Sequence, residues 1–407
     1  MRVLLVHPNF PGQFRRVAGV LARTPGVEVF GLGDSTWMRG TTPVDGVRVA
    51  GYAAPPTAAE ATHPYARKFD EAIRRGVQAA QALAAAKKSE GLRPDVIVTH
   101  PGWGDGFFLR DVFPDTKVIG LFEYFYNARG ADVGFDPESP GRPDDGPRLH
   151  ALNAVQLLAL QSCDEGFCPT HWQRSRFPSM WQERLSVLHE GIDTRQVAPD
   201  PSASATLPDG TKLKAGDEVL TYVARNLEPY RGYHIFMRAL PAILKARPQC
   251  RVLIVGGDGA SYGPKPTPPM TYRQKYLDEA AAQLDMSRVH FVGRIPFNQY
   301  LKVLQISRLH VYLTYPFVLS WSMMEAMSAG CLVLGSATPP VQEVLTDGEN
   351  GLLFPFLSHE ALAERAIEAL TNPQKYDALR ANARETIVRK YDFETIALPA
   401  YLRMLKV

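Results

Sequence analysis

The chain has few cysteines, no long apolar run and little net charge, and each shortage excludes a class of protein. Four cysteines in 407 residues are too few for a disulfide framework, so we expect four free thiols. No run of eighteen apolar residues occurs, which excludes an ordinary transmembrane helix. The strand-like segment Met1–His7 breaks at Pro8 before a signal-peptide core forms, which predicts a cytoplasmic protein.

Charge and metal-binding patterns are equally sparse. The formal net charge of +3 allows an anionic ligand but does not indicate nucleic acid. Cys163 and Cys168 lack a second Cys/His pair at metal spacing, no His-x-x-x-His pair occurs, and Asp144-Asp145 lies in a Pro/Gly-rich loop. We expect no metal, no other cofactor and no nucleic-acid partner; a homodimer stays open.

Short apolar runs alternate with helical patterns along the whole chain, which predicts an α/β fold with doubly wound parallel sheets. Unbroken apolar runs indicate strands buried on both faces. The predicted strands are Val3–Val6, Val27–Leu32, Val96–Thr99, Lys117–Phe122, Glu165–Cys168, Val219–Ala224, Arg251–Val255, Val289–Val292, Leu309–Tyr315 and Cys331–Gly335.

A chain of 407 residues exceeds what one core usually serves, so we expect two domains. The stretch Gly191–Gly216, rich in Pro, Ser, Ala and Asp, marks the boundary, which predicts domains at 1–195 and 196–388 and a final segment at 389–407. That segment has helical spacing that we expect to break at Pro399. The long loops Asn127–Gly146 and Ala260–Met270 are equally compatible with lids and with disordered connections.

Two segments contain the main candidate ligand-binding residues. Arg225 and Arg231 lie in a loop between a predicted strand and a helix start, a suitable place for a diphosphate, although such arginines are more often solvated or paired. Glu325 lies in a helix of small residues beginning near Ser320, where a carboxylate is otherwise a common helix former. Gly12 follows the first strand and would let its loop approach a ligand, or is merely a turn residue.

The ordered set of motifs resembles the retaining nucleotide-sugar glycosyltransferases of the GT-B fold, in the group called family four. The resemblance covers most of the chain and is densest from Val219 to Phe354. Its motifs are Arg225…Arg231-Gly232, Val255–Gly259, His290–Arg294, Glu325-Ala326-Met327 with Gly330, Pro340–Glu343 and Asp347–Pro355.

The resemblance implies two Rossmann-like domains facing across a cleft, with the acceptor bound by the first and the donor by the second. It assigns the donor diphosphate to Arg225 and Arg231 and the ribose hydroxyls to Glu325. It also implies a terminal segment that crosses back to the first domain. The remaining donor contacts that it implies are Gly12, Gly257, Arg294 and Ile295 near the base, Phe317, and the amides of Ser320, Trp321 and Ser322.

The chain departs from the family pattern at two positions. Phe317 stands where the family has the first Glu of its motif, and a phenyl ring cannot accept a hydrogen bond from a sugar hydroxyl. Glu123 stands where a His is often found; among aromatic residues its pKa can be raised, so that it binds or deprotonates an acceptor hydroxyl. The alternative for Glu123 is pairing with a nearby Arg that fixes a loop.

Three further residues are candidates for the acceptor side. His100 and Trp103 follow a predicted strand, and Tyr124 follows Glu123. A His beside Pro is more often structural, and aromatic residues near an interface are usually core.

We expect a metal-independent, retaining hexosyltransferase that uses a nucleoside-diphosphate sugar such as a UDP- or GDP-sugar, with Arg225, Arg231 and Glu123 as catalytic residues. The nucleobase stays open, and so does the acceptor, which can be a sugar, a lipid-linked saccharide or a small molecule. Two alternatives remain. A non-catalytic homologue acting as a binding or scaffolding subunit would explain Phe317. Another GT-B enzyme, such as a sugar-nucleotide epimerase or a phosphorylase, would be distinguished by its products.

Overall fold

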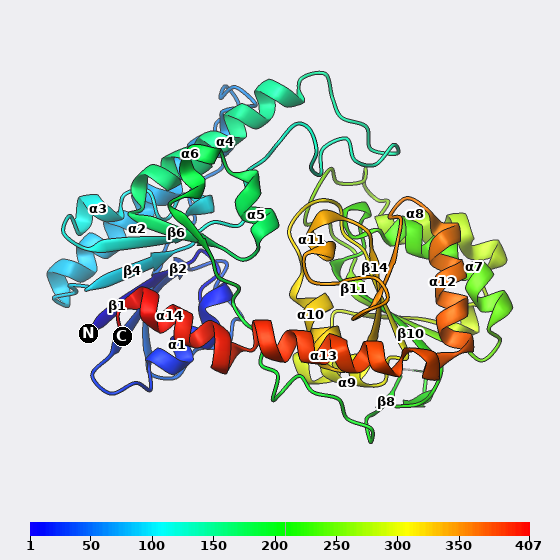
Figure 1. Ribbon diagram of the computed structural model, residues 1–407. Helices are drawn as coiled ribbons and strands as arrows, with labels where there is room; N and C mark the ends of the chain where they lie inside the picture. The colour runs from blue at the N-terminus through cyan, green and yellow to red at the C-terminus, as the bar shows by residue number, and fades with distance from the viewer. Residues whose placement is uncertain (208) are drawn as a thin grey trace. The chain divides into compact units, whose positions relative to one another are not determined.

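The computed structural model describes residues 1–207 and 209–407 and divides the chain into two compact units. Unit 1 comprises Met1–Gly134, Ser139–Glu190 and Ala397–Val407, and unit 2 comprises Phe135–Glu138 and Gly191–Ile396 (Figure 1). The chain therefore does not fill the units in sequence order: a short piece of the first half belongs to unit 2, and the last residues belong to unit 1.

Unit 1 contains a parallel seven-stranded sheet. Its strands, in spatial order, are β3 (Val47–Tyr52), β2 (Glu28–Asp34), β1 (Arg2–Val6), β4 (Val96–Thr99), β5 (Lys117–Leu121), β6 (Glu165–Cys168) and β7 (Leu185–Val187). Helices α2 (Arg67–Ser89) and α4 (Asp145–Ser162) pack against each other (Figure 1). The other helices are η1 (Gly12–Phe14), α1 (Arg15–Leu21), η2 (Pro101–Trp103), α3 (Leu109–Val112), α5 (His171–Arg176), α6 (Ser179–Gln182) and α14 (Leu398–Leu405).

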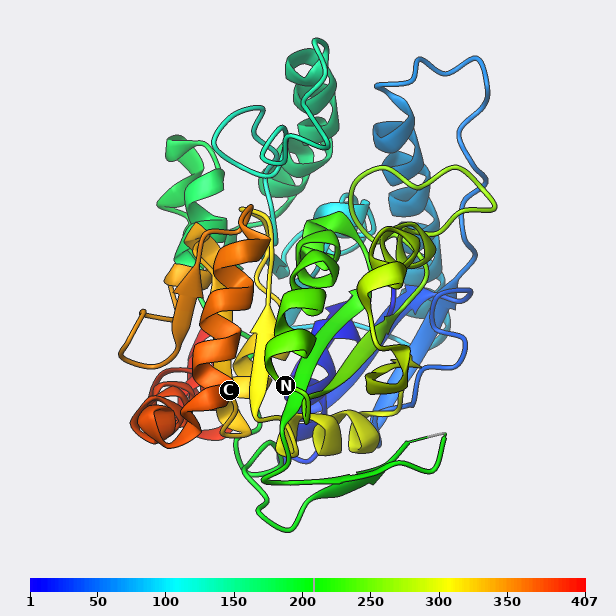
Figure 2. The same ribbon diagram turned by 90° about the vertical axis from the view of Figure 1, so that its right-hand side faces the viewer.

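Unit 2 contains a parallel six-stranded sheet and an antiparallel pair, β8 (Ser204–Thr206) and β9 (Lys212–Lys214). The sheet order is β12 (Val289–Gly293), β11 (Arg251–Gly257), β10 (Val219–Asn226), β13 (Leu309–Tyr312), β14 (Leu332–Ser336) and β15 (Leu352–Phe354). Figure 2 shows α7 (Tyr233–Ala246) and α12 (His359–Thr371) in front of these strands, where they pack together. The other helices are η3 (Pro229–Arg231), α8 (Tyr272–Ala280), η4 (Ala281–Gln283), η5 (Met286–Arg288), α9 (Phe297–Gln305), α10 (Trp321–Ser328), α11 (Pro339–Gln342), η6 (Pro373–Tyr376), α13 (Asp377–Tyr391) and the π-helical η7 (Phe393–Ala397).

Both sheets reverse their strand order beside their first strand. In unit 1 β1 lies between β2 and β4, and in unit 2 β10 lies between β11 and β13. In open parallel sheets, ligands bind beyond the carboxyl ends of the strands at such a reversal. The fold thus singles out one edge of each unit, defined by the loops after β1 and β4 and by the loops after β10 and β13.

Every strand predicted from an apolar run is present, and the doubly wound α/β class is confirmed. The pattern missed β3, in which three of the six residues are exposed and only Tyr52 is buried, and the three-residue strands β7, β8, β9 and β15. The expected break at Pro399 is wrong, because Pro399 lies in the first turn of α14, where a missing N–H costs no helical hydrogen bond.

Candidate functional site

The ends of β10, β11 and β12 meet at one edge of unit 2. Arg225, at the end of β10, is exposed, while the neighbouring Asn226 is buried and accepts a hydrogen bond of 2.8 Å from Arg294. A Cβ atom at Gly257 would lie 2.5 Å from Nε of Arg294, so any side chain there would displace Arg294 from this position. Two of the predicted donor contacts, Gly257 and Arg294, are thereby brought together, and Arg225 directly precedes Asn226 in the chain.

Arg231 is buried, with 7% of its surface exposed. One terminal nitrogen donates to Oγ1 of Thr314 at 2.7 Å and to the carbonyl of Val318 at 3.0 Å, and the guanidinium lies 5.1 Å from the ring centre of Tyr262. Burial opposes its charge, but the neighbouring Tyr312, Tyr262 and Glu228 outweigh burial and raise the pKa of Arg231. A permanently charged, rigidly held cation results.

Glu228, which the sequence did not single out, fixes the geometry around Arg231. It is fully buried, and its carboxylate accepts from the backbone N–H of Ser261 at 3.0 Å and of Tyr262 at 2.9 Å. Burial raises the pKa of Glu228 against the opposing effect of these hydrogen bonds. The contacts join the loop after β11 to the loop after β10, which positions Tyr262 against Arg231.

Phe317 is buried in a cluster of aromatic rings. Its ring centre lies 5.6 Å from that of Tyr230 and 5.0 Å from that of Tyr262, both in edge-on geometry. The ring therefore packs beside the Arg231 loop, at the position where the family pattern has a carboxylate.

Two backbone N–H groups at the start of α10 already donate hydrogen bonds to side chains of the protein. The N–H of Ser320 donates to the hydroxyl of Tyr312 at 2.8 Å, and the N–H of Ser322 donates to Oγ of Ser320 at 3.3 Å. Trp321, between them, is half-buried. Any phosphate bound by these amides has to replace these contacts.

Glu325 is buried in α10 and accepts a hydrogen bond of 2.7 Å from the hydroxyl of Tyr300 on α9. Ile295, just before α9, is half-buried and packs against the neighbouring apolar cluster. Tyr300 was not among the candidates; its only signal in the sequence is its place in the helix after Arg294-Ile295.

The carboxyl edge of the unit 1 sheet holds a second polar network. His7 follows β1, and its Nε2 lies 2.7 Å from Oε1 of Gln13; the amide of Gln13 donates to Glu123 at 2.7 Å. Nε2 of His100, after β4, lies 3.2 Å from the other oxygen of Glu123. Gly12 has a φ of +47°, and a Cβ there would lie 2.5 Å from the His7 ring, so this glycine permits the packing of His7.

The protonation of this network differs from the expectation for Glu123. Burial acts to raise its pKa, but pairing with His100 and the hydrogen bond from Gln13 prevail and lower the pKa of Glu123 to about 2. Burial also opposes the charge of His100, yet Glu123 raises the pKa of that imidazole. Burial and the nearby His100 lower the pKa of His7 to about 3. Within the described residues, Glu123 is therefore an ionised partner of His100 rather than a neutral acid or the partner of an arginine.

The two aromatic candidates on this edge differ. Tyr124 is buried, and its hydroxyl donates to Asp132 at 2.9 Å, so the phenol is engaged inside unit 1. Trp103 is 48% exposed. Of the pair, only Trp103 presents its ring to a ligand.

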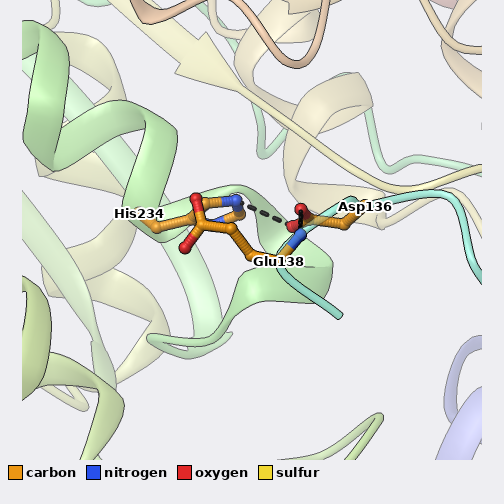
Figure 3. A group of neighbouring side chains, drawn as sticks. All are labelled: Asp136, Glu138 and His234. Atoms are coloured by element: carbon orange, nitrogen blue, oxygen red, sulfur yellow. Dashed lines mark hydrogen bonds and ion pairs between the residues drawn. The ribbon is translucent and has the colours of Figure 1, made fainter. Parts of the chain in front are cut away.

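Unit 2 also contains a group of three side chains that no pattern in the sequence connects. Asp136, Glu138 and His234 each offer a potential metal-ligand atom, all within 4.8 Å of one another (Figure 3). Nε2 of His234 lies 2.9 Å from Asp136, which also accepts from the hydroxyl of Tyr315. Arg238 pairs with Glu138, so the guanidinium of Arg238 already balances the negative charge of the Glu138 carboxylate.

Two parallel α/β sheets, each with polar loops gathered where its strand order reverses, are the architecture of a GT-B glycosyltransferase. Two family models match the chain: the glycosyl transferase family 4 group over residues 26–197 and glycosyl transferases group 1 over residues 205–386. The chain belongs to these family 4, group 1 glycosyltransferases.

Curated relatives are distant. The phosphatidyl-myo-inositol mannosyltransferase of Mycobacterium leprae is 29% identical over 343 residues, covering 71% of this chain and 85% of the relative. Spore coat protein SA of Bacillus subtilis is 23% identical over 241 residues, covering 55% of this chain and 59% of the relative. The match thus spans less than two thirds of the spore coat protein.

Solved structures share the fold over the whole chain. Sucrose-phosphate synthase from Thermosynechococcus elongatus has a TM-score of 0.75 at 20% identity, covering 100% of this chain and 98% of that one. Anabaena HepE in complex with UDP and glucose has a TM-score of 0.67 at 15% identity, with 100% of both chains covered. In the part of the chain that the structure describes, no helix has the length and apolar character needed to cross a membrane.

Proposed function

We propose that this glycosyltransferase moves a hexose from a nucleoside-diphosphate sugar to an acceptor hydroxyl, with retention of anomeric configuration and without a metal ion. The observation that carries the proposal is the pair Arg225 and Arg231 on the carboxyl edge of unit 2, one exposed and one buried and charged. Two guanidinium groups supply the positive charge that a metal ion would otherwise bring to a diphosphate.

The reaction follows from this charge. As the bond between the anomeric carbon and the diphosphate oxygen breaks, negative charge grows on the leaving diphosphate, and Arg225 and Arg231 stabilise it. The acceptor oxygen attacks the same face of the sugar, and its proton passes to the departing diphosphate oxygen. In this scheme Glu325, Arg294 and Ile295 contact the nucleoside, and the first turn of α10 contacts phosphate oxygens.

Glu123 belongs to the acceptor side in this proposal. A carboxylate with a pKa of about 2 is a weak base, but it accepts hydrogen bonds well, so it orients an acceptor hydroxyl. Glu123→Gln should lower acceptor-dependent transfer by about tenfold or more, with unchanged nucleotide binding. Full transfer activity in that variant would contradict the proposed role of Glu123 in acceptor binding.

The nucleotide is proposed to be UDP or GDP. UDP is named in the HepE complex, and the family match supports a nucleotide sugar in general. We further propose a cytoplasmic enzyme, which the four free, buried cysteines support.

A thermal-shift titration with UDP, GDP, ADP and dTDP tests the donor. A ligand at a hundred times its dissociation constant stabilises the folded state by about 2.7 kcal/mol. We expect one nucleotide to raise the unfolding temperature and Arg225→Ala to abolish the shift. Arg231→Lys preserves charge at the buried position, and exposed Arg389→Ala is the matched control. Absence of a shift with every nucleotide would contradict the proposal.

A non-catalytic nucleotide-binding homologue is the second candidate, because Phe317 packs among aromatic rings where the family pattern has a carboxylate. It predicts nucleotide binding without release of sugar. Incubation with the matching nucleotide sugar separates the two: hydrolysis or transfer supports the enzyme, and an intact donor after prolonged incubation supports the homologue.

A further inference from the structure

Two tryptophans of unit 1 lie exposed beside each other at the edge of the sheet where β2 and β4 end. Trp37 is 39% and Trp103 is 48% exposed. Their ring centres are 5.4 Å apart and the ring planes meet at 83°. The indoles thus form a corner with two nearly perpendicular aromatic walls that are open to solvent.

A buried charged network lies beneath this corner and connects the two turns. Asp34, fully buried at the end of β2, binds Arg75 of α2 at 2.8 Å. Arg75 contacts the hydroxyl of Tyr52 at 3.1 Å, and that hydroxyl donates to the fully buried Asp105 at 2.9 Å. Asp34 begins the turn that carries Trp37, and Asp105 lies two residues after Trp103.

The network contacts the Trp37 ring, and the turn that carries Trp103 packs closely on α2. The guanidinium carbon of Arg75 lies 4.6 Å from the centre of the Trp37 ring, a cation–π contact that fixes this indole. Gly104, after Trp103, has a φ of +101°, and a Cβ there would lie 2.1 Å from the carbonyl oxygen of Ala72 on α2. The Trp37 ring and the backbone of the turn that carries Trp103 are therefore held before any ligand arrives, as a binding site requires.

The surroundings of the corner favour a neutral, flat ligand. The turn at residues 35–40 contributes one exposed arginine, Arg39, and the turn at residues 101–106 contains no basic residue. Arg75 is neutralised by Asp34. An anionic bilayer surface requires a cluster of basic side chains, which these two turns do not supply. A pyranose ring, with a C–H face for one indole and an edge for the other, matches the corner.

We propose that Trp37 and Trp103 form a saccharide-binding subsite and that the acceptor of this glycosyltransferase is itself a carbohydrate. This inference depends on the proposed transfer function for the role of the sugar as acceptor, but not for its binding. Trp103 lies in the turn that begins directly after His100, the partner of Glu123, so the subsite and that pair share one loop of unit 1.

Binding of free disaccharides tests the subsite without any donor. The probes are maltose, cellobiose, mannobiose and chitobiose, followed by saturation-transfer NMR and by tryptophan fluorescence. We expect at least one probe to bind and Trp37→Ala or Trp103→Ala to weaken binding about tenfold or more, with Trp→Phe variants in between. Met180→Ala, which removes a side chain that is 75% exposed on α6, is the control.

The outcomes separate this inference from the proposed function. Nucleotide binding with no saccharide binding, or saccharide binding that both Ala variants keep, overturns the subsite and leaves the transferase proposal intact. Saccharide binding without nucleotide binding supports the subsite and contradicts the transferase proposal. Binding to phosphatidylglycerol vesicles that requires both tryptophans, with no disaccharide binding, would assign the corner to a membrane surface and overturn the inference.

Discussion

Arg225 and Arg231 carry the same charge but differ in the freedom of their side chains. Arg225 is exposed, whereas Arg231 donates to Thr314 and Val318 inside unit 2. Loss of Arg225 should therefore affect ligand binding with little change in stability. Loss of Arg231 leaves buried acceptors without a donor and should cost stability as well. Thus Arg225 is the better probe of function, and Arg231 must be replaced conservatively.

Neutralising each of the two buried aspartates near Arg75 should change the free energy of unfolding in opposite directions. Burial raises the pKa of Asp105 from 3.8 to about 6, despite hydrogen bonding to Tyr52 and the nearby Arg75. A raised carboxyl pKa means that the protonated form favours folding: its contribution is complete below pH 3.8 and is lost as the pH rises through about 6. Asp105→Asn should therefore raise the free energy of unfolding at pH 8 by about 1 to 3 kcal/mol.

The same substitution should have little effect at pH 4, where Asp105 is protonated in the wild-type protein. Urea denaturation at both pH values measures the difference. Asp34→Asn is the contrasting variant, because it removes the ion-pair partner of the largely buried Arg75 and should destabilise unit 1. Equal effects of Asp105→Asn at the two pH values would contradict the assignment.

At the scale of elements, apolar periodicity predicted the sheets well because their central strands are buried on both faces. β14, for example, is buried at every residue. β3 was not predicted because its exposed residues interrupt the apolar run. β15 was not predicted because three residues are too few to show a strand periodicity. The motif around Arg225 and Arg231 was visible because a strand, a loop and a helix start follow one another in the sequence.

The rest of the site depends on contacts between distant segments. Nothing near Glu228 in the sequence indicates that Ser261 and Tyr262 bind its carboxylate. Trp37 was missed because its partner Trp103 lies in a different turn. The low pKa of Glu123 likewise comes from His100, on the neighbouring strand's loop. Such pairs form only when the parallel sheet brings strand ends together.

The segment Phe135–Glu138 is anchored in unit 2 by one carboxylate. Asp136 pairs with His234 at 2.9 Å and accepts from Tyr315 at 2.5 Å, and Phe135 packs against the Tyr315 ring. Burial opposes the charge of Asp136, but these hydrogen bonds lower its pKa from 3.8 to about 2. A lowered carboxyl pKa contributes stability above pH 3.8 that disappears as the pH falls through about 2.

Asp136→Asn should therefore lower the free energy of unfolding by about 1 to 3 kcal/mol at pH 7 and speed amide exchange in the segment. The difference from wild type should shrink as the pH falls from 4 to 2. Glu138→Gln is the control, because that side chain is 43% exposed and its ion pair with Arg238 is worth less. An effect of Asp136→Asn no larger than that of the control would refute the anchor.

At the scale of the whole molecule, the last residues of the chain belong to unit 1, so the stability of unit 1 depends on them. Ala397–Val407 belong to unit 1, and two of their side chains, Tyr401 and Leu405, are each only 2% exposed. The Tyr401 ring meets Phe167 of β6 edge-on at 5.6 Å. Each unit also has apolar clusters of its own, so damage to one core need not reach the other.

Tyr401→Ala should destabilise unit 1 by about 3 to 5 kcal/mol, as expected for deleting a buried ring. Tyr401→Phe is the matched control: among the described residues its buried hydroxyl has no hydrogen-bond partner, so removing that oxygen should be neutral or slightly stabilising. Hydrogen exchange should accelerate in β5 and β6 of the Ala variant, while β10 and β11 keep their protection and the nucleotide affinity is unchanged. Equal acceleration in both sheets would mean that the two cores unfold as one.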